Sequence, residues 1–191
     1  MMDIFKILIS SAIVDNVVFI QYLAICPFIG MTSETDKAAG MGIATSFVIV
    51  LATAVTWPIY KLFMIPFHLE FLQTLIFILV IASLVQLVEF FLKKSIPSLY
   101  RSMGVYLALI TTNCAVLGVT INCISKNYNY VESIVYALGT ALGFLMSMVI
   151  MSGVRSKLKT AKIPKAFQGT PILYIAASLL SLAFLGFKGL I

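Results

Sequence analysis

The sequence has very little charge and few of the side chains on which soluble enzymes depend. Of its 191 residues only 10% are charged and 61% are hydrophobic, and the mean hydropathy is +1.09. Such a chain has too little polar surface to cover a water-soluble globule. It also lacks a polar segment long enough for a soluble domain, so any nucleotide, flavin or soluble electron carrier must bind elsewhere. We therefore predict an integral membrane protein with a single domain, residues 1–191.

Histidine and cysteine are also scarce, which limits the metal sites that the chain can build. It contains one histidine, His68, and three cysteines, Cys26, Cys114 and Cys123. Zinc commonly takes histidine or carboxylate ligands beside thiolates, and neither stands near Cys26 or Cys114 in the sequence. Nothing in the composition supports nucleic-acid binding. A thiol in an apolar segment has no packing advantage over Ala or Val, so redox chemistry or soft-metal ligation is the distinctive use that it offers.

The charged residues divide the chain into six apolar segments, each long enough to cross a bilayer as an α-helix. Asp15 and Glu89 interrupt two of them. The N-terminus has no net positive charge and no small-residue cleavage site, so we expect the first span to be retained. The fold class is thus all-α integral membrane, with six transmembrane helices expected at 7–33, 38–60, 71–92, 102–125, 133–154 and 166–187.

Lysine and arginine are distributed unequally between the two ends of these spans. The positive-inside rule makes the richer side cytoplasmic, and both termini then face outward. The richer side has nine basic residues, namely Lys37, Lys93, Lys94, Arg101, Arg155, Lys157, Lys159, Lys162 and Lys165. The other side has four, namely Lys6, Lys61, Lys126 and Lys188.

A five-residue phrase occurs once in each half of the chain. It reads Cys26-Pro27-Phe28-Ile29-Gly30 and then Cys114-Ala115-Val116-Leu117-Gly118. Each half, about 1–95 and 96–191, holds three spans, and because three is odd the second half must enter the bilayer from the opposite side. The sequence therefore predicts two inverted three-helix repeats with the phrase near their symmetry axis. Alternatively, cysteine is simply a small membrane residue here and the phrase arose twice by chance.

The residues beside the two cysteines indicate interrupted helices. Pro27 removes a backbone donor, and the second copy is preceded by Thr-Thr-Asn. We expect the first and fourth helices to break there, with both thiols inside the hydrocarbon and with freed backbone N–H groups available to a thiolate or sulfide.

The number of thiols limits what they can hold. A 2Fe-2S cluster normally needs four thiolates, so two matched cysteines supply only half. Cys123 lies nine residues beyond Cys114, which places it on the opposite face of a continuous helix and predicts an ordinary buried thiol. A disulfide between Cys26 and Cys114 is a further possibility.

Three other features have structural as well as functional interpretations. Asp15 is expected to lie deep in a span, where it has either an ion or gating role or a structural contact. Glu89 is expected to pair with Lys93 at i,i+4. Gly139 and Gly143 form a G-x-x-x-G pair that predicts close helix packing.

Longer phrases resemble the RnfA branch of the NqrDE/RnfAE family over essentially the whole chain, more than its quinone-reductase branch. They are Val14-Asp15-Asn16, Leu23-Ala24-Ile25 before Cys26, Leu109-Ile110-Thr111-Thr112-Asn113 before Cys114, Pro97-Ser98-Leu99-Tyr100-Arg101, and the stretch 180–187. The resemblance implies an electron-carrying subunit of the Rnf complex, an ion-translocating ferredoxin:NAD oxidoreductase, with no activity alone. An NqrE-type subunit of the Na⁺-translocating NADH:quinone reductase is the alternative within the family.

The same resemblance implies a site and a set of partners. Cys26 and Cys114 would be metal ligands of one 2Fe-2S cluster shared with a homologous subunit of opposite topology (RnfE-like), and electron flow would be coupled to Na⁺ or H⁺ movement. The other implied partners are the RnfB, RnfC, RnfD and RnfG-like subunits and membrane lipid, in the bacterial cytoplasmic (inner) membrane. An inverted-repeat secondary transporter and a passive membrane anchor are the rival interpretations from other classes.

Overall fold

A computed structural model describes residues 2–64, 70–95, 109–110, 112–161, 164 and 167–187 of the chain. Every regular element within these ranges is helical, which confirms the predicted all-α class. The elements are α1 (Met2–Ile9), the π-helix η1 (Ser10–Val14), α2 (Ile25–Met31), α3 (Thr35–Ile59), the π-helix η2 (Tyr60–Met64), the 3-10 helix η3 (Glu70–Leu72), α5 (Gln73–Ser95), α8 (Cys114–Ser125), α9 (Tyr130–Thr160) and α10 (Thr170–Leu185).

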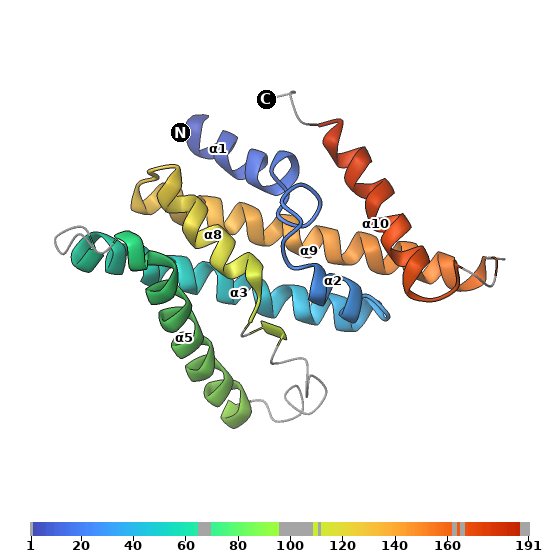
Figure 1. Cartoon of the computed structure of the whole chain (residues 1–191), viewed down its shortest axis with the longest axis horizontal. Coiled ribbons are helices and arrows are strands. Elements are labelled where there is room, and N and C mark those ends of the chain that lie inside the picture. The colour runs from blue at the N-terminus through green and yellow to red at the C-terminus, as the bar shows by residue number, and fades with distance from the viewer. Residues whose placement is uncertain are drawn as a thin grey trace.

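Helices α3 and α9 form the centre of the fold. They lie side by side along the long axis of the molecule, and α1 and α8 pack against them (Figure 1). The 25 residues of α3 give a length of about 37 Å, more than the roughly 30 Å hydrocarbon core of a bilayer. Ser46 Oγ on α3 donates to the Ala141 carbonyl of α9 at 3.2 Å. This pair is the frame on which the cysteine-bearing segments are held.

The first helix approaches α9 closely at the two glycines of the G-x-x-x-G pair. A Cβ at Gly139 would lie 2.7 Å from the Leu8 carbonyl oxygen, and one at Gly143 would lie 2.6 Å from that of Ala12. Both distances are shorter than real Cβ contacts, and both involve backbone atoms. The predicted close packing is therefore confirmed, and its partner is the segment that leads to Cys26.

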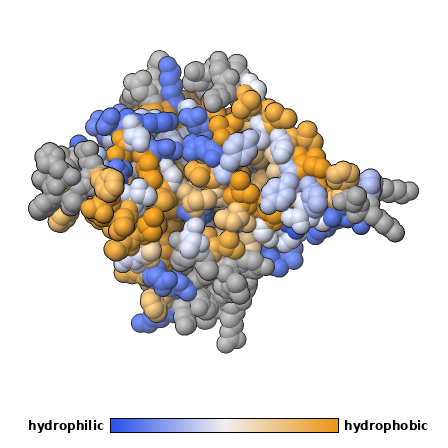
Figure 2. Space-filling view, in the orientation of Figure 1, coloured by the Kyte–Doolittle hydropathy of each residue, from blue (hydrophilic) through white to orange (hydrophobic). Residues whose placement is uncertain are grey.

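The surface and the lengths of the helices are those of a multi-pass membrane protein. Three helical stretches in the described part of the chain are long and apolar enough to cross a bilayer, Thr35–Met64, Gln73–Phe90 and Tyr130–Thr160, and shorter apolar helices cover Ile4–Val14, Cys114–Ser125 and Thr170–Leu185. Large apolar side chains such as Phe47, Leu79 and Leu182 are exposed, and Figure 2 shows apolar residues over much of one face. The full count of six spans stays a prediction.

Contacts place some of the basic residues at the two ends of the molecule that the sequence predicts for them. At one end, Lys159 Nζ donates to the Ser33 carbonyl at 3.0 Å, close to Lys37 in the sequence. At the other end, Lys6 and Lys126 line one cavity, and Lys61 Nζ lies 4.7 Å from the ring centroid of Trp57, whose Nε1 donates to the Tyr128 carbonyl. Expected members of these groups that lie outside the described residues are Arg101, Lys162, Lys165 and Lys188; His68 and Tyr100 lie outside them as well.

Candidate functional site

The first span is broken before Cys26, and one asparagine organises the break. The sequence predicted a break but not its position, because Pro27 and Gly30 both lie inside α2. The π-helix η1 ends at Val14, residues 15–24 are not helical, and α2 begins at Ile25. Asn16 is fully buried and its Nδ2 donates to the carbonyls of Ala12 and Gly143, each at 3.1 Å. Its Oδ1 accepts from the backbone N–H of Val18 and from Ser147 Oγ, each at 3.0 Å. These bonds replace the helical hydrogen bonds that the break removes. Within a membrane, water cannot supply the replacements.

A strained residue lies at the point where the chain re-enters a helix. Ala24 has φ +60° and ψ +32°, the left-handed conformation that costs an L-residue about 1–2 kcal/mol. Its side chain is fully buried, and its N–H donates to Cys114 Sγ at 2.9 Å. The strain is therefore located at the residue that connects the two cysteine segments, as strained backbone at functional sites often is.

The Cys114 segment is also interrupted, but it is supported differently. The backbone is helical at 109–110, turns at 112–113, and begins α8 at Cys114. Asn113 is the N-cap, and its Oδ1 accepts from the Ala115 N–H at 3.0 Å. Its Nδ2 is buried and has no acceptor among the described residues. The described residues thus have a non-helical turn directly before Cys114, and the earlier part of the expected fourth helix, 102–108, lies outside them.

Both cysteines therefore stand at the N-terminal ends of helices. Cys26 is the second residue of α2 and Cys114 is the first of α8. Helix N-termini present unpaired N–H groups and a positive partial charge, which favour a thiolate over a thiol. The expected donation of a freed N–H group to a cysteine sulfur is confirmed by Ala24 and Cys114.

The structure brings the two thiols together although 88 positions separate them in the sequence. They lie close enough to interact electrostatically, and both are free and exposed at the surface of the chain. Leu23, in the loop before Cys26, occupies the space that a Cβ on Gly118 would need. A Cβ on Gly30 would meet open space instead. The glycine is therefore required by close packing in the second copy of the repeated phrase but not in the first.

The donor set fits half of an iron–sulfur site. Within the described ranges, no group of three or more His, Cys, Asp or Glu residues is placed to hold a metal ion. Cys123 is buried and its Sγ points to the Ser133 carbonyl at 3.8 Å, so it joins neither exposed thiol. No disulfide links Cys26 to Cys114. Two exposed thiols with an open side, a donated N–H and an unpartnered Asn113 amide match a cluster completed from outside the chain.

The two carboxylates within spans are farther from this centre. Asp15 Oδ2 lies 3.4 Å from Lys126 Nζ, at the end where Lys6 also lies, and the side chain is partly exposed. The expected depth of Asp15 in the membrane stays a prediction. The contact supports the structural alternative for this residue. The expected pair of Glu89 with Lys93 involves a Lys93 side chain outside the described part of the chain.

Two site residues were not identified from the sequence as organisers. In the sequence, Asn16 directly follows Asp15, and Asn113 ends the Thr-Thr-Asn run before Cys114. An asparagine in each apolar run is the signal in the sequence: Asn16 lies ten residues before Cys26, and Asn113 directly precedes Cys114. Ala24 gives no such signal, because alanine rarely adopts a left-handed conformation.

Comparison with known proteins bears directly on this geometry. Residues 4–191 match the family described as Rnf-Nqr subunit, membrane protein. The chain belongs to the Rnf-Nqr family. The matched range includes both cysteine segments and all the helices from α2 to α10.

Relatives in this family match over nearly their full length. The chain is 48% identical to the A subunit of the ion-translocating oxidoreductase complex of Syntrophotalea carbinolica, over 100% of this chain and 99% of the relative. It is 48% identical to the A subunit of the Na(+)-translocating ferredoxin:NAD(+) oxidoreductase complex of Acetobacterium woodii, over 99% and 98%. The corresponding A subunit of the ion-translocating oxidoreductase complex of Azoarcus sp. is 50% identical over 96% and 95%.

Proposed function

We propose that this chain is the A-type membrane subunit of an Rnf ion-translocating ferredoxin:NAD oxidoreductase. In this proposal, Cys26 and Cys114 hold half of one 2Fe-2S cluster, and a homologous subunit of opposite topology supplies the other two thiolates. The complex acts as a translocase, and this chain is inactive alone. The names of three relatives, each the A subunit of an ion-translocating oxidoreductase, support the Rnf branch over an NqrE-type assignment.

The observation that carries the proposal is the meeting of two exposed thiols at the starts of two half-helices. A thiol pair kept for packing would be buried as Cys123 is, and a structural disulfide would be closed. Exposure of both thiols on an apolar surface requires something to cover them in the membrane, because a thiolate in hydrocarbon is costly. A second subunit with its own cysteine pair supplies both the cover and the missing ligands.

Inverted three-helix repeats fit the packing of the described helices. If 1–95 and 96–191 are the repeats, α3 corresponds to α9, and these two helices form the central pair. The same relation pairs α2 with α8. The contacts of α2 with α9 then correspond to those of α8 with α3, and the contacts of α3 with α5 correspond to those of α9 with α10. We place the Lys159 end in the cytoplasm of a bacterial inner membrane and both termini outside, on the basis of the basic residues.

The residues around the thiols have defined tasks in this mechanism. When bound, a 2Fe-2S cluster accepts and releases single electrons. Cys26 and Cys114 supply thiolates, and the Ala24 N–H stabilises negative charge on Cys114 Sγ. Hydrogen bonds to sulfur raise the reduction potential, so Ala24 also tunes electron transfer.

Coupling to Na⁺ or H⁺ is proposed to act through the half-helices. A change of one charge in a low-dielectric site is a large perturbation. Here it acts on α2, a helix of only seven residues that is separated from η1 by a non-helical stretch. Such a segment moves at a lower cost than a continuous span, which makes it suited to switch between inward-open and outward-open arrangements.

Low-temperature EPR of the intact complex tests the ligand assignment. Cys26→Ser and Cys114→Ser should each remove one 2Fe-2S signal and lower the iron content by two atoms per complex. Cys123→Ala is the matched control, because Cys123 lies on the same helix as Cys114 but is buried. This variant should leave the signal unchanged. Survival of every 2Fe-2S signal in both serine variants would show that these cysteines are not the ligands.

The same variants separate the proposal from its rivals. A secondary transporter has no need for matched thiols, so ion transport by a double-serine variant at the wild-type rate would favour that class. A passive anchor would hold no cluster, so an intact complex in which neither serine variant changes iron content or electron transfer would favour that role.

A further inference from the structure

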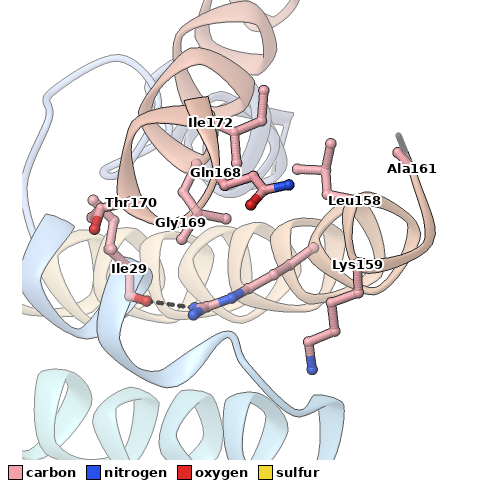
Figure 3. Close-up of a pocket in the computed structure, with 10 residues that line it drawn as sticks. Ile29, Leu158, Lys159, Ala161, Gln168, Gly169, Thr170 and Ile172 are labelled. Atoms are coloured by element: carbon pink, nitrogen blue, oxygen red, sulfur yellow. Dashed lines mark hydrogen bonds between the residues drawn. The ribbon is translucent and has the colours of Figure 1, made fainter. Parts of the chain in front are cut away.

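A cavity of about 480 Å³ lies at the end of the molecule that carries Arg155 and Lys159. It is bounded by the end of α9, the start of α10 and α2, so it lies between helices rather than on one of them (Figure 3). Its walls are of two kinds. Arg155, Lys159, Gln168 and Thr170 are polar, and Ile29, Leu158, Ile172 and Leu173 are apolar.

Among the described residues, the charged side chains of the cavity walls are all positive. Arg155 and Lys159 are the charged residues that line it, and its described walls include no carboxylate. Lys159 Nζ points out of the cavity toward the Ser33 carbonyl, so it contributes its charge at longer range (Figure 3). An anion entering the cavity would meet no like charge on these walls.

Arg155 is the group with which such an anion would bond. Its Nη1 donates to the Ile29 carbonyl at 2.8 Å and weakly to Thr32 Oγ1 at 3.4 Å. Its Nε and Nη2 have no acceptor among the described residues. A guanidinium has five donors in a planar fork that matches phosphate oxygens, so one edge holds α2 while the other is available to a ligand.

The apolar walls indicate what the anion is attached to. Leu158 and Ile172 project toward the cavity beside the Gln168 amide (Figure 3). Next to it, α10 exposes Tyr174 and Ile175, as a helix facing lipid does. A pocket that combines a cation with apolar walls at the membrane surface matches a phosphate carried on acyl chains, and basic pockets between membrane helices on the cytoplasmic side bind such headgroups.

We propose that this cavity is a phosphate-binding site that takes the headgroup of an anionic phospholipid, with Arg155 as its main ligand. This inference does not depend on the iron–sulfur role. It has a structural consequence, because Ile29 lies three residues after Cys26 on α2. A lipid bound to Arg155 would fix the residue that holds the cysteine-bearing half-helix.

The test measures lipid binding to the purified full chain in detergent. Short-chain phosphatidylglycerol, phosphatidylcholine and inorganic phosphate are each titrated while retained lipid is followed by native mass spectrometry. Phosphatidylglycerol should bind at least about tenfold more tightly than phosphatidylcholine. Both lipids offer a phosphate to Arg155, but the quaternary ammonium of phosphatidylcholine is repelled by the positive cavity walls. Arg155→Gln should weaken phosphatidylglycerol binding by about tenfold or more.

A second variant keeps the test valid if Arg155→Gln does not fold. Thr170→Glu places a carboxylate on the cavity wall but leaves the bonds of Arg155 to α2 intact, and an acidic residue in the first turn of α10 favours that helix. It should weaken phosphatidylglycerol binding to a similar extent. Lys157→Gln is the matched control, because Lys157 is an exposed cation of α9 that does not line the cavity. Its loss should have no effect.

Three results would overturn the proposal. Equal affinity for phosphatidylglycerol and phosphatidylcholine would exclude anion recognition. Wild-type binding by Thr170→Glu, or an equal loss in Lys157→Gln, would exclude this cavity. Inorganic phosphate binding as tightly as phosphatidylglycerol would identify free phosphate as the ligand and exclude a lipid. None of these results bears on the EPR signals of the cysteine variants, so the two proposals fail independently.

Discussion

The two cysteine-bearing segments have similar chemistry but different structural support. Before Cys26 the chain runs through a non-helical stretch held by buried Asn16 and a strained Ala24, and it then forms the short helix α2. Before Cys114 there is a brief turn capped by Asn113, followed by the longer α8. Hydrogen bonds of Asn16 with Gly143 and Ser147 hold the first segment to α9, whereas in the second segment Asn113 caps α8, which packs mainly against α3. The repeated phrase thus places two cysteines at equivalent positions without equivalent packing around them.

The largest expected difference concerns the two asparagines. Asn16→Ala removes bonds to two carbonyls and leaves the buried Val18 N–H without its acceptor, so it should lower the free energy of unfolding by about 3 kcal/mol. Asn113→Ala removes one cap, together with an amide that has no described acceptor, and should cost about 1 kcal/mol. Denaturant titration of the full chain in micelles measures both.

Asn122→Ala serves as the control for this pair. Asn122 Nδ2 donates to Gln21 Oε1 at 3.0 Å in a partly buried contact, so its loss should cost less than about 1 kcal/mol. Equal losses for Asn16→Ala and Asn113→Ala would show that the two breaks are supported in the same way, contrary to the hydrogen bonds described above.

A smaller difference is expected at the two glycines of the repeated phrase. Gly118→Val places a branched side chain where Leu23 lies, so it should cost about 2 kcal/mol. Gly30→Ala meets open space within α2 and should stabilise the isolated chain by up to about 1 kcal/mol through helix propensity. Thermal unfolding in micelles measures whether each variant raises or lowers the stability of the chain.

Assembly of the complex extends this glycine prediction. If Gly30 faces the partner subunit, Gly30→Ala should stabilise the isolated chain and yet lower its recovery with the complex. Destabilisation of the isolated chain by Gly30→Ala would contradict the open space beside that glycine.

The difference between the two segments also explains which features could be predicted from the sequence. Apolar length predicted the helical class, and the G-x-x-x-G pair predicted the close approach at Gly139 and Gly143, because both depend on local composition. The paired cysteines could be recognised as the candidate site because the same phrase occurs in both halves. Their sharing of one cluster remains a proposal.

Features that depend on distant contacts could not be predicted in this way. Asn16 terminates η1 through Gly143 and Ser147, which lie more than a hundred positions away. Arg155 holds Ile29 over a similar separation. The contact of Asp15 with Lys126 could not be predicted either, because 111 positions separate the two residues.

The smallest expected effect concerns the end of the molecule opposite Arg155, where Lys126 pairs with Asp15. Burial disfavours the charged ammonium, but Tyr136, Tyr128 and Asp15 outweigh burial and raise the pKa of Lys126 above its ordinary value. A raised folded pKa contributes stability that is fully present below the unfolded pKa of about 10.4 and is lost as pH rises through the folded pKa. Because the pair is partly exposed, Lys126→Met should cost less than about 1 kcal/mol at pH 8. The difference in unfolding free energy between this variant and the wild type should shrink as the pH rises above the unfolded pKa of about 10.4, and also in 1 M salt, as measured by denaturant titration. A difference independent of both pH and salt would show that the charge of Lys126 is not what stabilises the fold.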